Sequence, residues 1–198
     1  MIQNKSNSWA ALLLTLFAGG AAASAQEARW RPDGTLEFPK DYREWVYMSS
    51  GLGMTYGPAA PNAMESPRFD TVFVNPPAWK KFKETGHWPD GTIFILEIRN
   101  SESHGSINKG GFYQTDVTAI EANVKDARFP SGIGFFSFGG GKNPVRESAP
   151  ELGKESNSCR ACHTTNGAVD GTFTQFYPAA FAIAKDKGTV KSSRSEVH

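Results

Sequence analysis

The sequence predicts an α+β fold, mainly an antiparallel β-sheet with flanking helices, and three observations lead to this prediction. At least four segments between residues 71 and 138 are rich in β-branched and aromatic residues, as strands are. Short or hairpin-length connections join them, which favours antiparallel pairing. Helical segments that open at Pro76 and Pro178 flank these strands.

The first half of the chain is predicted to hold two helices and one strand. Residues 39–48 interleave aromatic and charged side chains, a pattern typical of a short amphipathic helix. A loop rich in Gly, Pro and Ser follows at 49–67, and residues 71–75 (Thr-Val-Phe-Val-Asn) form a strand. The second helix opens at Pro76 and ends before Gly86.

The second half of the chain is predicted to be mostly β. Residues 88–91 (Trp-Pro-Asp-Gly) form a turn, because proline presets one backbone dihedral and glycine permits a positive one. Three further strands are predicted at residues 92–98, 111–124 and 132–138. A helix follows Pro178, and the tail from Gly188 is expected to fray.

The first 25 residues have the features of a secretory signal peptide. Lys5 supplies one positive charge, an apolar run covers residues 9–18, and small residues end in Ala23-Ser24-Ala25. The run is too short to span a bilayer, which takes about 20 apolar residues. We therefore expect an exported, periplasmic protein with no membrane span and a single domain over residues 26–198.

The charge balance excludes two classes of partner. The whole chain carries a formal net charge of +1, and removal of Lys5 with the signal peptide leaves 20 basic and 20 acidic side chains. No electrostatic footprint for nucleic acid or for an anionic membrane remains. The carboxylates Asp116, Glu121 and Asp126 are expected on solvated strand faces or loops.

The chemistry of the chain is concentrated in one pentapeptide near the C-terminus. Cys159-Arg160-Ala161-Cys162-His163 is a C-x-x-C-H motif, and the chain has no other cysteine. Two thiols at this spacing attach to the two vinyl groups of one porphyrin while the adjacent imidazole reaches the iron. The motif therefore predicts covalent attachment of haem c through Cys159 and Cys162, with His163 as an axial ligand.

Three other interpretations of the motif were weighed. A thioredoxin-like pair would follow an early strand of a βαβ unit, whereas this pair lies late in the chain after a loop rich in Pro and Ser. A zinc site would need a fourth ligand from a distant residue. An oxidised pair is the ordinary expectation for an exported protein, but it leaves the histidine unexplained.

No residue stands out as a second axial ligand of the iron. The remaining histidines and the methionines outside the signal peptide are His87, His104, His198, Met48, Met54 and Met64. The histidines are expected beside a turn, in a polar loop and at the C-terminus. Met48 is expected in the core, and Met54 and Met64 lie in a loop as minor alternatives. Because the sixth ligand separates electron transfer from ligand chemistry, this pattern favours an open iron site.

Several segments, in this order along the chain, resemble the cytochrome P460 family. They are Phe-Pro-Lys-Asp-Tyr-Arg-Glu-Trp at 38–45, the helix after Asn75-Pro76, Asp-Gly-Thr-Ile-Phe-Ile-Leu-Glu at 90–97, Gly-Phe-Phe-Ser-Phe at 134–138, and the haem motif with residues 173–178. The resemblance covers nearly all of the chain after the signal peptide. It implies a mostly antiparallel β fold, a homodimer, and five-coordinate haem on His163.

The family implied by this resemblance has two functional branches. One oxidises hydroxylamine and joins a strand lysine to the porphyrin; the other, cytochrome c′-beta, lacks that bond and binds nitric oxide and carbon monoxide in an apolar distal pocket. The position of the lysine, directly before a glutamate, is Leu96 here, and residues 92–98 contain no lysine. The sequence is therefore more similar to the cytochrome c′-beta branch.

The expected function is the binding of small gaseous ligands at an apolar distal pocket. Strand alternation places Leu96 on one face with Phe94 and Ile98, and Phe136 is a further candidate for the pocket wall. Hydroxylamine oxidation and electron transfer to a partner cytochrome remain as alternatives, and weak peroxidase activity is left open. No catalytic residue is assigned.

Overall fold

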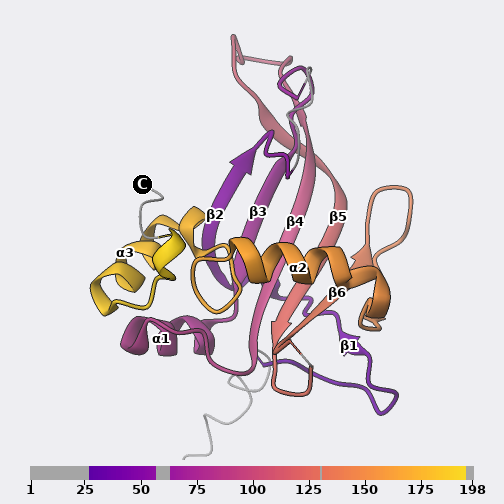
Figure 1. Cartoon of the computed structure of the whole chain (residues 1–198). Helices are drawn as coiled ribbons and strands as arrows, with labels where there is room; N and C mark the ends of the chain where they lie inside the picture. Colours follow the sequence, from indigo (N-terminus) through magenta and orange to yellow (C-terminus); the bar gives the residue numbers. More distant parts are fainter. Residues whose placement is uncertain (1–26, 57–62, 130, 195–198) are drawn as a thin grey trace, which may run out of the picture.

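A five-stranded antiparallel sheet dominates the computed structural model, which describes residues 27–56, 63–129 and 131–194 (Figure 1). Its strands are β2 (Val46–Leu52), β3 (Phe69–Val74), β4 (Thr92–Glu102), β5 (Tyr113–Lys125) and β6 (Ile133–Gly139). Each strand pairs with the next one along the chain, so the sheet is a meander. The predicted α+β fold with an antiparallel sheet is confirmed.

The prediction of a helix at residues 39–48 is wrong. Only a single 3-10 turn forms there, at Tyr42–Glu44, and β2 begins at Val46. Residues 46–52 pair with β3 on either side of an irregularity at Met48, and the Met48 side chain is buried. The sheet partner therefore overrides the local amphipathic pattern, and the predicted loop loses its first residues to β2.

Helices α1 (Pro76–Thr85) and α3 (Pro178–Lys187) form as predicted. Each has proline in its first turn and ends at a glycine in the left-handed region, with φ of 74° at Gly86 and 68° at Gly188. They contact each other beside the sheet (Figure 1). Their buried side chains, among them Phe82 and Phe181, pack with residues of the sheet and of neighbouring turns in a first core cluster that also includes Val74, Trp88, Phe94 and Tyr177.

The other face of the sheet carries a second core cluster. Its members include Leu36, Tyr42, Ile93, Ile95, Val124, Phe136 and Phe138. Two strands of two residues each, β1 (Leu36–Glu37) and β7 (Ser148–Ala149), pair with each other and add buried residues to it. Strands this short carry no alternation, so the sequence did not reveal them.

Helix α2 (Asn157–Asn166) was not expected from the sequence, and it contains the whole C-x-x-C-H motif. It lies across the strands of the sheet (Figure 1). A 3-10 turn (Gly153–Ser156) leads into it, and two more occur at Thr174–Phe176 and Ser192–Arg194.

The tail after α3 is anchored as far as Lys191, contrary to the prediction. The hydroxyl of Thr189 donates to the Gly86 carbonyl at 2.8 Å, and the Lys191 backbone N–H donates to the Ala168 carbonyl at 2.8 Å. These bonds bring the tail against α1 and against the loop that follows α2.

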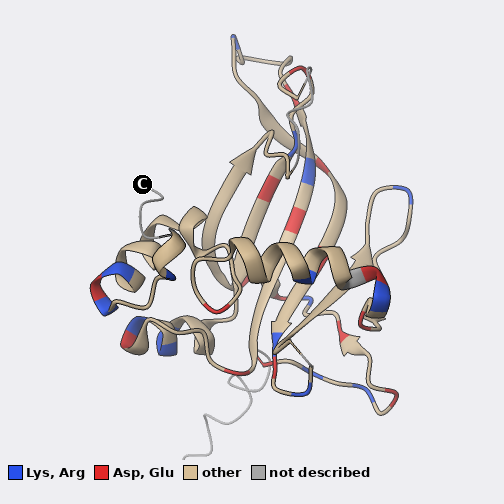
Figure 2. Ribbon diagram, viewed as in Figure 1, with Lys and Arg blue, Asp and Glu red and all other residues tan. Residues whose placement is uncertain are grey.

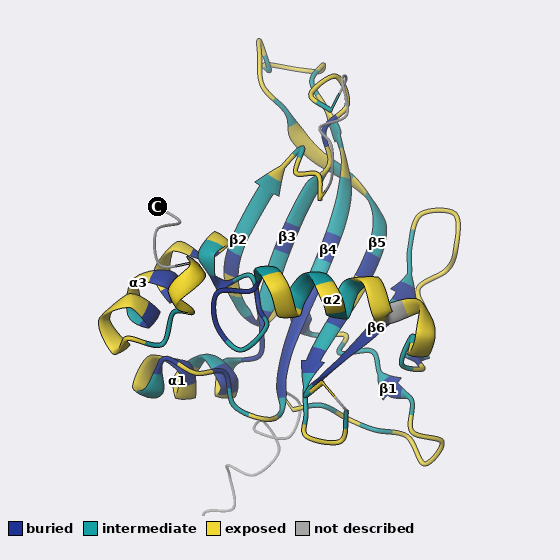
Figure 3. Ribbon diagram, viewed as in Figure 1, coloured by how far each residue is buried: buried dark blue, intermediate teal, exposed yellow. Residues whose placement is uncertain are grey.

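Burial and charge follow the same layout. Buried residues are concentrated where helices and short strands cover the sheet, while the tip of the β4–β5 hairpin is exposed (Figure 3). Charges of both signs are spread over the ribbon (Figure 2). Among the described residues, no helix is long and apolar enough to cross a membrane. The expected signal peptide lies outside the described residues.

Candidate functional site

Helix α2 places the three residues of the haem motif together. Cys159, Cys162 and His163 are separated by three and four positions, so a helix presents them on one side. All three line a cavity of about 430 Å³ that is bordered by α2, by strands β3 to β6 and by the loop after α2. Both cysteines are free thiols of intermediate burial.

The sheet supplies an apolar wall of this cavity. Phe94 and Leu96 of β4 line it, and Val72 of β3 stands next to Leu96 in the strand register. Phe94 and Leu96 therefore share one face of β4 and line the same cavity. Ile98, two residues further along the same face, lies beyond the cavity lining.

Phe136 occupies a different place from its neighbour Phe135. Phe136 borders the cavity, but its ring packs on Trp30 and Phe129 in the second core cluster, with ring centroids 5.7 and 6.0 Å away. Phe135 points to the cavity side and meets the ring of His163 edge-on, with centroids 5.0 Å apart. Alternation along β6 therefore makes Phe135 the nearer aromatic neighbour of the motif.

Polar groups also line the cavity, and sequence reasoning missed them. Glu121 of β5 pairs in register with Leu96 and lines the cavity with Asn123 and Tyr56. Desolvation, with the charge of nearby Asp70, raises the pKa of the Glu121 carboxyl above its ordinary value. Glu121 lies on an exposed strand face, as expected, but its place beside the cavity depends on the pairing of β4 with β5.

His163 is held by a backbone acceptor. Its Nδ1 lies 2.9 Å from the carbonyl oxygen of Gly171, an atom that only accepts hydrogen bonds. Nδ1 therefore carries the proton, and Nε2 is left with a lone pair for a metal. Burial lowers the pKa of the imidazole, which favours the same neutral form.

The loop that carries Gly171 packs directly against the end of α2. The Gly167 N–H donates to the His163 carbonyl at 2.8 Å. A Cβ at Gly167 would lie 2.6 Å from the Gly171 carbonyl carbon and 2.7 Å from both the His163 oxygen and the Thr172 nitrogen. Only glycine allows backbone segments to approach this closely.

No second histidine and no methionine lines the cavity among the described residues. Met48 is buried in the first core cluster, Met54 and Met64 are exposed, and none of the three is part of the cavity lining. His87 contacts Asp170, and His104 lies in the exposed β4–β5 connection. His198 lies outside the described residues.

The side chains that line the cavity fit haem c better than they fit a zinc ion. In the described part of the chain, no group of three or more His, Cys, Asp or Glu side chains is placed to hold a metal ion. The cavity instead combines two free thiols, a neutral imidazole and an apolar wall. Cys159 and Cys162 would hold the porphyrin and His163 its iron, an arrangement that matches haem attachment.

A comparison with protein-family models decides the family. The model described as Cytochrome P460 matches residues 39–174, which include β2 to β6 and the haem motif. The chain belongs to the cytochrome P460 family. The family resemblance is thereby confirmed, and as a family member the protein is a cytochrome that binds haem c with its iron. A search of curated proteins found no match.

Proposed function

We propose that this cytochrome P460 family member is a periplasmic mono-haem protein that binds small gaseous ligands such as nitric oxide and carbon monoxide at an open iron site. In this proposal, Cys159 and Cys162 attach the haem and His163 is the single axial ligand from the protein. The proposal includes export through a signal peptide at residues 1–25, a single domain over 26–198, a homodimer, and a cytochrome as redox partner.

One observation carries this proposal. The cavity that contains Cys159, Cys162 and His163 is walled by Phe94 and Leu96, and no other histidine or methionine of the described residues lines it. A five-coordinate haem needs such a vacant side. Neutral diatomic ligands bind ferrous iron without hydrogen-bond donors, so an apolar wall suits them.

The bound haem c would supply the iron on which a gaseous ligand is held, and the protein residues control access to it. Phe94 and Leu96 exclude water and anions from their side of the cavity. The Gly171 carbonyl holds the proton of His163 on Nδ1, which keeps Nε2 available for the iron. The ring of Phe173 lies beside His163, with ring centroids 4.3 Å apart, and Tyr56 stacks on the Phe173 ring at 6.2 Å.

A second candidate, hydroxylamine oxidation, is favoured by one observation. Glu121 lines the cavity in register with Leu96, and its raised pKa suits a group that takes up protons as electrons leave a substrate. Against this candidate, β4 contains no lysine for a bond to the porphyrin. Peptide mapping separates the two functions, because a lysine–porphyrin adduct would appear only in the oxidase.

Optical spectra of the purified protein, ferric and ferrous, with and without nitric oxide, test the proposal. We expect haem that stays with the denatured chain, a high-spin five-coordinate ferrous spectrum, and direct binding of nitric oxide and carbon monoxide. Cys159→Ala with Cys162→Ala should release the haem to acid-acetone extraction. His163→Ala should lose the proximal bond, whereas His104→Ala in the exposed hairpin connection should leave the spectrum unchanged.

Two results would contradict gas binding as the main function. A six-coordinate low-spin ferrous spectrum that collapses on replacement of Met54 or Met64 would make the protein an electron carrier. Many turnovers of hydroxylamine per haem, lost on Glu121→Gln, would establish the oxidase instead.

A further inference from the structure

The residue before the His163 acceptor, Asp170, lies in a turn with an unusual backbone. The Thr172 N–H donates to the Val169 carbonyl at 2.8 Å, and the two central residues have positive φ, 48° at Asp170 and 70° at Gly171. Positive φ at both central positions is the mark of a type I′ turn, for which Asp-Gly is a preferred pair. The Asp-Gly pair thus explains the local shape of this turn.

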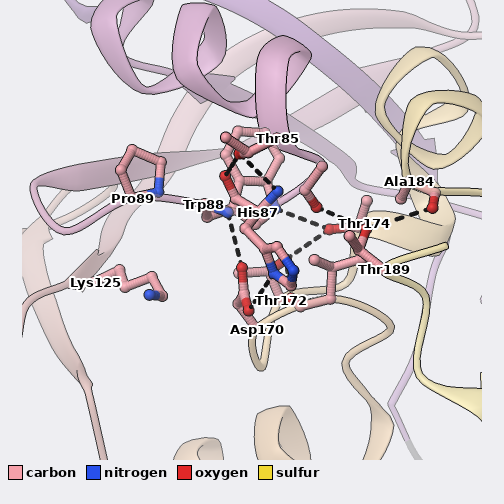
Figure 4. A network of polar contacts seen from close by, with 12 residues as sticks. Thr85, His87, Trp88, Pro89, Lys125, Asp170, Thr172, Thr174, Ala184 and Thr189 are labelled. Carbon is pink, nitrogen blue, oxygen red and sulfur yellow. Dashed lines mark hydrogen bonds and ion pairs between the residues drawn. The ribbon is translucent and has the colours of Figure 1, made fainter. Parts of the chain in front are cut away.

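The carboxylate of Asp170 ties this turn to a segment more than 80 positions earlier in the chain. Its Oδ2 accepts the backbone N–H of Trp88 at 2.8 Å, and its Oδ1 lies 3.2 Å from Nδ1 of His87 (Figure 4). The His87 side chain is 58% exposed, whereas Asp170 is mostly shielded. The bond to Trp88 is therefore the more protected of the two.

Trp88 is a rigid partner for this contact. It is 1% exposed, its ring stacks on Phe82 with centroids 3.8 Å apart, and it meets Phe94 edge-on at 4.8 Å. Its indole N–H also donates to the Thr174 hydroxyl at 3.0 Å, so the loop after α2 is bound to Trp88 at two points (Figure 4). The position of the loop is thus set by the core rather than by the loop alone.

These contacts converge on the candidate haem ligand, because the carbonyl of Gly171 directly follows Asp170 and accepts the His163 Nδ1 proton at 2.9 Å. We propose that Asp170 is a positioning residue for the proximal histidine: by accepting the Trp88 N–H, it holds the Gly171 carbonyl where it strengthens His163 as a donor to iron. This inference rests on the proposed role of His163.

The expected effect of losing this anchor has a definite sign. A hydrogen bond from Nδ1–H to a well-placed acceptor makes the imidazole more basic and a better donor to iron, which stabilises the ferric state. When the carbonyl moves away, the reduction potential should rise and the iron–histidine stretching frequency of the ferrous protein should fall. We expect a severalfold and at most about tenfold change in the ferrous to ferric ratio, or about 59 mV for a one-electron couple.

Two substitutions at Asp170 test the proposal in the haem-loaded full chain. Asp170→Gly removes the anchor but tolerates the positive φ, and Asp170→Asn tolerates it while keeping a carbonyl oxygen for the Trp88 N–H. We expect the potential and the resonance Raman iron–histidine band to shift in Asp170→Gly and to return close to wild type in Asp170→Asn. Asp33→Gly is the matched control, because Asp33 accepts the Thr35 N–H in an exposed turn elsewhere.

The outcomes are distinguishable. An unchanged potential and stretching band in Asp170→Gly, or a shift of equal size in Asp170→Asn, would overturn the positioning role. Should Asp170→Gly fail to fold, hydrogen exchange of the wild-type Trp88 amide decides: slow exchange supports the anchor and free exchange overturns it. If the wild type itself lacks an iron–histidine band, the proposed role of His163 fails, whichever way the Asp170 variants behave.

Discussion

The two faces of the central sheet differ in their surroundings: one borders a cavity, and the other is packed against a core cluster. On one face, Phe94 and Leu96 of β4 line the cavity that contains the haem motif. On the other face, Ile95 packs in the second core cluster and Glu97 is buried in a network of charged partners. Since side chains alternate along a strand, Phe94 and Leu96 face the cavity, and Ile95 and Glu97 face the opposite side of the sheet.

The network around Glu97 shows how the second face differs chemically. The Glu97 side chain is only 4% exposed and accepts hydrogen bonds from Tyr42, from Arg43 at 2.6 Å and from Arg99 at 2.5 Å. Burial opposes its ionisation, but the hydrogen bonds from these three residues outweigh burial and lower the pKa of Glu97. Glu97, which follows Leu96, is therefore a structural anion on the face of β4 opposite the cavity.

The largest expected effect is the loss of this anion. Glu97→Ala leaves Arg99 and Arg43 without their partner, and breaking a buried ion pair costs about 3–5 kcal/mol. Chemical denaturation should show a loss of this size in the free energy of unfolding, with the haem spectrum of the remaining folded protein unchanged. Glu84→Ala, which breaks an exposed pair with Lys81, is the matched control and should cost under about 0.5 kcal/mol.

A Glu97→Ala protein as stable as the wild type would contradict the distinction between the two faces. So would a Glu97→Ala protein whose nitric oxide binding changes while its stability does not, because Glu97 would then act on the cavity side.

Neighbouring residues of β4 give the sharpest form of the comparison. Ile95→Ala should cost about 2–5 kcal/mol, because Ile95 is fully buried, and it should leave ligand association nearly unchanged. Leu96→Ala should cost about 1–2 kcal/mol, because Leu96 is only partly buried, and it should speed the association of carbon monoxide by widening the cavity. Denaturation curves and flash photolysis measure the two effects.

The pattern of the two alanine variants, and not either value alone, decides the test. If Ile95→Ala speeds ligand association as much as Leu96→Ala does, the two faces of β4 do not differ in their effect on ligand binding.

The smallest expected effect concerns pH: the contributions of Glu97 and Glu121 to the stability of the protein should change with pH in opposite directions. Both glutamates have an ordinary pKa of 4.5. The pKa of Glu97 is lowered in the folded protein, so its stabilisation is complete above pH 4.5 and is lost as the pH falls through the folded pKa. The pKa of Glu121 is raised, so its contribution is present below pH 4.5 and is lost as the pH rises through the folded pKa.

Glutamine variants isolate these two contributions. Glu97→Gln should reduce the fall in stability on the acid side, and Glu121→Gln should reduce the fall above pH 4.5. Denaturation midpoints measured across pH 3–8 check both. If the difference in stability between wild type and variant changes with pH in the same direction for Glu97→Gln and Glu121→Gln, the assigned environments are contradicted.

Elements whose signals are local could be predicted from the amino-acid sequence. The helices that open at Pro76 and Pro178 and end before Gly86 and Gly188 were predicted because proline and glycine act on their own backbone. The strand at 92–98 was predicted because it is rich in β-branched and aromatic residues. The haem motif was read from five consecutive residues, and the family match contains it.

Features that depend on residues far apart in the chain could not be predicted in this way. Residues 46–52 became strand β2 because β3 offered a pairing partner, and Glu121 entered the cavity because β5 pairs with β4 in that register. Asp170 meets Trp88 only after the loop beyond α2 folds back on the core. Periodicity reports which face a side chain shares with its near neighbours, whereas register and packing choose what lies opposite that face.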